Sequence, residues 1–159
     1  MKQAELSKWL KTIVIVAAVC CIALGAFLIP VIGREEAAAA PELAYLFWPC
    51  LIFFWITEII VLAALVQAWR IFSEIGRDNS FCAENAARLK NISRLAAADS
   101  VLYAVCAVVL AALNALHPGG LLIFAGIVFI GLAITIASAA LSHLTQKAAS
   151  LKDENDLTI

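Results

Sequence analysis

The sequence is poor in charge, and this scarcity excludes the ordinary soluble folds. Only 14% of its 159 residues are Asp, Glu, Lys or Arg, whereas 64% are hydrophobic. Soluble domains carry about 25% charged and about 45–50% apolar residues. The apolar residues also gather in runs long enough to cross a bilayer, which needs about 20 residues per helix. We therefore expect a membrane protein.

Motifs for catalysis, cofactors and nucleic acid are also missing. The five cysteines are odd in number and contain no C-x-x-C spacing, which argues against a thiol redox site. The two histidines, His117 and His143, fall at opposite ends of the expected helices, which excludes a bis-histidine haem and leaves too few clustered ligands for zinc. No Gly-rich phosphate loop and no basic stripe interleaved with aromatic residues occurs. We expect neither enzyme activity, nor a cofactor or metal, nor direct nucleic-acid binding.

Four apolar runs are present instead. They span about 12–32, 43–69, 95–116 and 120–142. None alternates like a strand, and because hydrocarbon cannot hydrogen-bond a bare peptide group, each run should be helical. The predicted fold class is all-α, a polytopic membrane protein in which residues 1–159 form a single four-helix transmembrane bundle.

The basic residues are distributed asymmetrically along the chain. Ten of the eleven Lys and Arg residues, all but Arg34, flank one side of the predicted spans. Because Lys and Arg near span ends favour the cytoplasm, we expect both termini, the segment 70–94 and the tail 143–159 to be cytoplasmic. The amino-terminal segment and the segment 70–94 are net positive, which suits anionic lipid headgroups, so the lipid bilayer is an expected partner.

A polar stretch, "GRDNSFCAENAARLKNISR", separates the second and third runs. "GRDNS" is typical of a turn, in which Gly76 could adopt unusual dihedral angles. From Ala83 onward, apolar residues recur at three- and four-residue intervals, which predicts an amphipathic helix that runs directly into span three. Glu84 falls in its first turn, where a negative charge is favourable, and Phe81 could anchor the turn. The segment 70–94 should be an ordered elbow, and periodicity leaves open whether it is a connector or a docking surface.

Two acids fall inside predicted spans. Glu58 lies near the middle of span two, and Asp99 lies near the inner end of span three. An ionised Asp near the bilayer centre costs at least about 2.5 kcal/mol, so both should face the bundle interior. Each could serve an ion or proton relay or a polar ligand pocket, or be a protonated acid hydrogen-bonded to a neighbouring helix. At 1.5 Å per residue from the inner span ends, Glu58 is about 18 Å deep and Asp99 about 7 Å deep, so Gln67 is a better partner for Asp99.

Two stretches, "GRDNSFCAENAARLKNI" and the terminal "LKDENDLTI", resemble the hallmark pair of a bacterial family of four-span membrane proteins of unknown function, the YoaS-like proteins. The matching residues are Gly76, Phe81, Glu84, Asn85 and Leu89, then Leu151, Lys152, Glu154, Asp156, Leu157, Thr158 and Ile159. The chain departs from the family at Cys82, where members usually carry Ser or Thr as a helix N-cap. A thiol is a weak acceptor, so this helix start is expected to be less well capped.

Members of that family are commonly encoded beside a small helix-turn-helix regulator of the Cro/CI type. The resemblance implies a protein of the bacterial cytoplasmic (inner) membrane that holds or modulates such a regulator. Its docking residues would be Phe81, Glu84, Asn85, Leu89, Lys152, Glu154, Asp156, Leu157 and Ile159. The alternative hypothesis is a small transporter or efflux subunit that uses Glu58, as a homo-oligomer because four short spans enclose little space.

Overall fold

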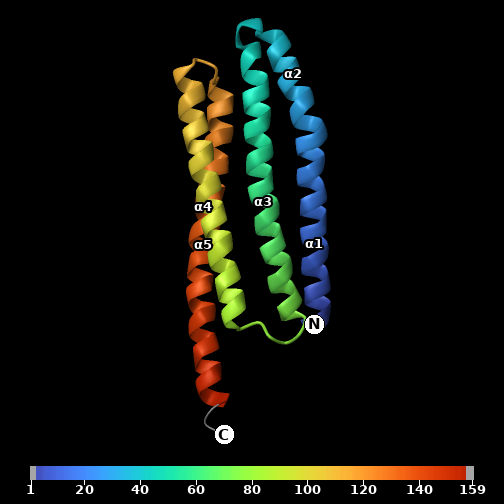
Figure 1. The fold of residues 1–159 in the computed structure, drawn as a ribbon, viewed down its shortest axis with the longest axis vertical. Coiled ribbons are helices and arrows are strands. Elements are labelled where there is room, and N and C mark those ends of the chain that lie inside the picture. Colours follow the sequence, from blue (N-terminus) through green and yellow to red (C-terminus); the bar gives the residue numbers. More distant parts are fainter. Residues whose placement is uncertain (1–2, 157–159) are drawn as a thin grey trace.

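A computed structural model describes residues 3–156, and this part of the chain is almost entirely helical (Figure 1). The α-helices are α1 (Gln3–Ala23), α2 (Ile29–Ala39), α3 (Phe47–Ile75), α4 (Ala83–Ala112) and α5 (Pro118–Asp156). A π-helical turn over Leu24–Leu28 joins α1 to α2, and a 3₁₀ segment over Pro41–Leu46 precedes α3. No strand occurs within residues 3–156, so the predicted all-α class is confirmed.

Four segments are long and apolar enough to cross a membrane, as predicted. They are Gln3–Ala39, Pro41–Ile75, Ala83–Ala112 and Pro118–Lys152. The third run was predicted to reach residue 116, but α4 ends at Ala112, because the chain turns at Asn114, whose φ is 52°. At their other ends these helices extend beyond the apolar runs, because hydropathy marks only the part that suits hydrocarbon. The polar stretches beyond them are rich in Ala, Glu and Lys, which favour helix in water too. The elbow helix predicted to continue into span three is likewise confirmed, since α4 is uninterrupted.

The helices contact one another in chain order and form an open row. Within the described residues, Cα atoms approach within 8 Å between α1 and α3, α3 and α4, and α4 and α5, but not between α1 and either α4 or α5. The amino terminus, the 76–82 loop and the end of α5 lie at one end of the row (Figure 1), here called the terminal end. The α2–α3 and α4–α5 connections lie at the other, the connector end.

The α4–α5 contact is built from small and hydroxyl-bearing residues. A Cβ atom added at Gly131 would overlap the hydroxyl oxygen of Ser100, which shows how closely the two helices approach. Nearby, the Ser93 hydroxyl donates to the Thr135 carbonyl oxygen at 2.9 Å. Lipid removes the usual hydrophobic drive for helix association, so close packing and interhelical hydrogen bonds have to hold such pairs together.

A π-helical turn interrupts the first span where the sequence contains proline. The Ile29 N–H donates to the Leu24 carbonyl oxygen, and Pro30 has no N–H. In an α-helix the Gly25 carbonyl oxygen would accept a hydrogen bond from the N–H of residue 29, and in a π-helical turn from that of residue 30. The Ile29 N–H is already bonded to Leu24 and Pro30 has none, so neither donor is available. That carbonyl oxygen instead accepts a hydrogen bond from Trp55 Nε1 of α3 at 3.1 Å. The released backbone group thus becomes a link between the first two spans.

The α4–α5 contact yields a prediction from two glycines of the same helix. Gly131→Leu should lower the free energy of unfolding by about 1–3 kcal/mol, because the new side chain overlaps Ser100. Gly126→Leu is the matched control, since a Cβ atom there meets nothing within 4 Å and leucine favours helix over glycine. SDS-induced unfolding in mixed micelles, followed by circular dichroism, measures both variants. Equal destabilisation of the two would contradict the predicted helix contact.

Candidate functional site

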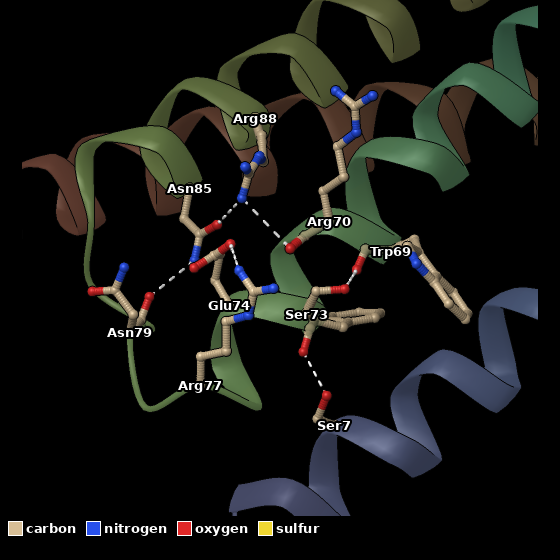
Figure 2. A network of polar contacts seen from close by, with 10 residues as sticks. Ser7, Trp69, Arg70, Ser73, Glu74, Arg77, Asn79, Asn85 and Arg88 are labelled. Carbon is tan, nitrogen blue, oxygen red and sulfur yellow. Dashed lines mark hydrogen bonds and ion pairs between the residues drawn. The ribbon is translucent and has the colours of Figure 1, made fainter.

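Hydrogen bonds of Asn85, which is only 1% exposed, hold the polar elbow together. Its Nδ2 donates to the carbonyl oxygens of Ser80 at 3.1 Å and of Asn79 at 3.5 Å. Its Oδ1 accepts a hydrogen bond from the Arg88 guanidinium at 2.9 Å (Figure 2). Both ends of the amide are therefore engaged, and the loop is held against the first turns of α4.

Two further contacts tie this elbow to the neighbouring helices. The Arg88 guanidinium reaches across to the carbonyl oxygen of Arg70 on α3 at 3.5 Å. From α1, the Ser7 hydroxyl donates to the Phe72 carbonyl oxygen at 2.6 Å, and Ser7 is itself buried (Figure 2). Helices α1, α3 and α4 thus converge at the terminal end through hydrogen bonds to backbone carbonyl groups.

The turn chemistry differs from the expectation in one detail. Gly76 has an ordinary φ of −66°, so the turn does not use its conformational freedom. A Cβ atom there would lie 2.7 Å from the Ser7 hydroxyl oxygen, so the missing side chain of Gly76 allows α1 to approach closely. The left-handed position is Asp78, with φ of 63°, which aspartate tolerates better than most residues.

The start of α4 is capped weakly, as the sequence predicted. Cys82 is the N-cap residue and makes no side-chain hydrogen bond as a cap. Asn85, three residues later, reaches back over the loop and bonds its carbonyl groups instead. The sequence signal for this role was an amide residue in the first turn of a helix that follows a short polar loop.

The predicted docking residues lie in different environments. Phe81 is 59% exposed at the loop, and Glu84 is exposed beside it. Leu89 is half-buried, and Asn85 is engaged inside the elbow, which leaves its side chain no surface for a partner. Lys152 and Glu154 are exposed on α5. The side chain of Asp156 and the residues Leu157 and Ile159 lie outside the described part of the chain.

The predicted tail is a continuation of α5 alongside the elbow. The Ser142 hydroxyl donates to the Ala86 carbonyl oxygen at 2.7 Å, just inside the start of α4. Thr145 and Ala149 are still buried further along, so α5 remains covered past the predicted membrane boundary. The start of α4 and this part of α5 are therefore held together at the terminal end.

The two intramembrane acids face different neighbours. A Cβ atom at Gly25 would overlap the carboxyl group of Glu58, so this side chain lies between α3 and α1 beside the π-helical turn. Asp99 Oδ1 is buried and has no hydrogen-bond partner among the described residues. The predicted Gln67 partner is therefore not bonded to this oxygen. Both acids lie within the helix array, as expected, but Asp99 lacks the partner expected of it.

The depths predicted for these acids also need correction. The hydroxyl oxygens of Thr57 and Tyr103 lie 3.1 Å apart, which brings these residues of α3 and α4 to similar levels. Glu58 and Asp99 then differ in depth by three residues, or about 4.5 Å, rather than about 11 Å. The count from the span ends failed because the two ends used as origins do not lie at the same level. The acids are nevertheless separated, since Glu58 faces α1.

These features define a four-span α-helical membrane protein with an ordered polar elbow at the end where α1 begins and α5 ends. A family model described as "Protein of unknown function (DUF2975)" matches residues 31–159. The chain is 30% identical over 153 residues to "Uncharacterized membrane protein YoaS" of Bacillus subtilis (strain 168), covering 95% of this chain and 96% of that relative. No solved structure shows significant similarity. The chain therefore belongs to the DUF2975 family, and its predicted resemblance to YoaS is confirmed.

The elbow network predicts a specific effect of Asn85→Ala. Loss of the amide leaves two loop carbonyl groups and Arg88 without their partner, which should lower the free energy of unfolding by about 1–3 kcal/mol. Hydrogen exchange of backbone amides in residues 77–82 should accelerate. Asn91→Ala, at an exposed position of the same helix, is the control. Unchanged exchange in the Asn85 variant would show that the amide does not order the loop.

Proposed function

We propose that this protein is a regulatory or interaction protein of the bacterial inner membrane that presents a docking face to the cytoplasm. The observation that carries the proposal is the contrast between Asn85 and Phe81 in one short stretch of chain. The first is 1% exposed and fixes the loop, whereas the second is 59% exposed. An ordered loop around an exposed aromatic side chain suits a binding surface, because rigid aromatic anchors bind at low entropic cost.

The proposed orientation follows from charge. Within residues 3–156, the terminal end carries nine of the ten basic residues, and Arg34 lies at the connector end. This bias favours a cytoplasmic location of the terminal end, with both chain termini inside and four crossings of the membrane. The elbow would then face the compartment in which transcription regulators act.

We further propose that the partner is a small helix-turn-helix regulator of the Cro/CI type. The Ser142–Ala86 bond holds α5 against the start of α4, and both the elbow and the end of α5 lie at the terminal end, where one partner would reach both. The last residues are acidic overall, with Lys152 outnumbered by Asp153, Glu154 and Asp156. An acidic rod suits the basic surface with which such regulators bind DNA. The membrane protein would hold the regulator away from DNA without catalysis and without touching DNA itself.

The transporter hypothesis gains no comparable support. It depends on Glu58, whose carboxyl group is packed against Gly25. A cavity of about 410 Å³ lies at the connector end, and neither Glu58 nor Asp99 lines it. We therefore do not propose transport.

The docking proposal predicts a loss of capture in Phe81→Ala. The protein, co-expressed with a small Cro/CI-type regulator of the kind that the family resemblance implies, should retain that regulator during purification in detergent. Phe81→Ala should weaken the affinity at least tenfold, about 1.4 kcal/mol, as expected for an aromatic anchor. Phe27→Ala is the control, since Phe27 is 73% exposed on the π-helical turn, far from the elbow.

Two results would contradict the proposal. One is a wild-type protein that fails to retain the regulator at micromolar concentrations of both. The other is retention at the wild-type level by a variant that combines Phe81→Ala with loss of the residues after Ser150, because the regulator would then bind without the proposed docking face.

A further inference from the structure

A cavity of about 410 Å³ lies at the connector end, between α2, α3, α4 and the start of α5. Its volume falls within the range of about 300–1,000 Å³ that is typical of small-molecule sites. Among the described residues, the backbone of α2 stays more than 8 Å from that of α4 and of α5, measured between Cα atoms, so the cavity separates them. The cavity is therefore a consequence of the open row of helices.

One wall of the cavity is fixed by a close approach of two helices. A Cβ atom added at Gly33 of α2 would lie 3.0 Å from the ring of Phe47 on α3. Both residues line the cavity. Helix α2 is thus held to α3 at this level, and the space beside it is part of the packed structure.

The floor of the cavity is aromatic. Tyr103 of α4 packs edge-on against Phe53 of α3 and Phe124 of α5, with ring centroids 5.4 Å and 5.8 Å away. The Thr57 hydroxyl donates its one proton to the Phe54 carbonyl oxygen at 2.8 Å. Tyr103 is therefore the donor in its 3.1 Å contact with Thr57, and its proton is not available to a ligand. The floor offers apolar ring surface.

The rim of the cavity carries its polar groups. Glu36 is the one residue with a formal charge among those that line the cavity, and it is exposed at the connector end. His117 accepts a hydrogen bond at Nδ1 from the Gly120 N–H at 3.0 Å, so the proton of the neutral ring is on Nε2. The rim thus combines a carboxylate with a ring N–H donor.

We propose that this cavity binds a small cationic amphiphile, with its apolar tail on the aromatic floor and its ammonium head at Glu36. Along α3 the lining extends from Phe47 to Phe54, about 10 Å at 1.5 Å per residue, which sets the length of the tail. A carboxylate at the mouth of an apolar cavity attracts a cationic head and repels an anionic one. This inference goes beyond the docking function proposed above and stands without it.

The test uses n-octylamine as the probe and the full chain in lipid nanodiscs. Cys50 and Cys106 line the cavity, whereas Cys20 is exposed elsewhere on the first span. Octylamine should slow alkylation of the two cavity thiols by a membrane-permeant maleimide at least tenfold, measured by peptide mass spectrometry. Labelling of Cys20 should not change. Octanoate and n-octanol, of the same chain length, should protect far less.

A pair of matched variants tests the role of the carboxylate. Glu36→Gln should raise the octylamine concentration for half-protection about tenfold. Glu35→Gln, an exposed neighbour that does not line the cavity, should leave it unchanged. The thermal unfolding of both variants should match the wild type, because both side chains are exposed.

Two outcomes would overturn the proposal. Equal protection by octylamine, octanol and octanoate, with no effect of Glu36→Gln, would mean that any acyl chain fills the cavity, as a membrane lipid would. Absence of protection by octylamine at concentrations that leave the nanodiscs intact would mean that the cavity is no site for a cationic amphiphile.

Discussion

The absence of water in hydrocarbon is the constraint on which this structure depends. Every backbone polar group inside the bilayer needs a partner from the protein, so the four spans are helices. The same constraint explains the first interruption of that pattern. Where Pro30 and the π-helical turn release the Gly25 carbonyl group, the indole N–H of Trp55 takes the place of the lost backbone donor. A local defect is thereby converted into a contact between spans.

Hydroxyl groups join the helices in a similar way. Ser7, Ser93 and Ser142 each donate to a carbonyl oxygen of a neighbouring helix, in the α1–α3 and α4–α5 pairs. These bonds allow close approach at glycines, and close approach supplies the dispersion contacts that lipid cannot replace. Within the described residues, contacts join only spans that follow one another along the chain, so the row is open. The open row leaves a cavity at the connector end. At the terminal end, the hydrogen bonds of the elbow hold α3 and α4 together.

The sequence predicted the architecture well because the constraint acts on composition. Four apolar runs and an amphipathic stretch before the third run were enough to predict four spans and an elbow helix continuous with span three. The contacts between helices were harder to predict from the sequence. The levels of Glu58 and Asp99 depended on helix ends that lie beyond the apolar runs, and the burial of Asn85 depended on the path of the loop. The cavity was not foreseen, since it arises from the separation of α2 from α4, which no local pattern encodes.

The central proposal is that the chain crosses the membrane four times, with both termini and the elbow on the cytoplasmic side. The most direct test inserts alkaline phosphatase, which is active only outside the cytoplasm, at single positions of the full chain. Fusions after residue 39 and after residue 116 should be active, and fusions after residue 79 and at the carboxyl terminus should be inactive. An active fusion at residue 79 or at the carboxyl terminus would contradict the proposed orientation and, with it, the cytoplasmic docking face.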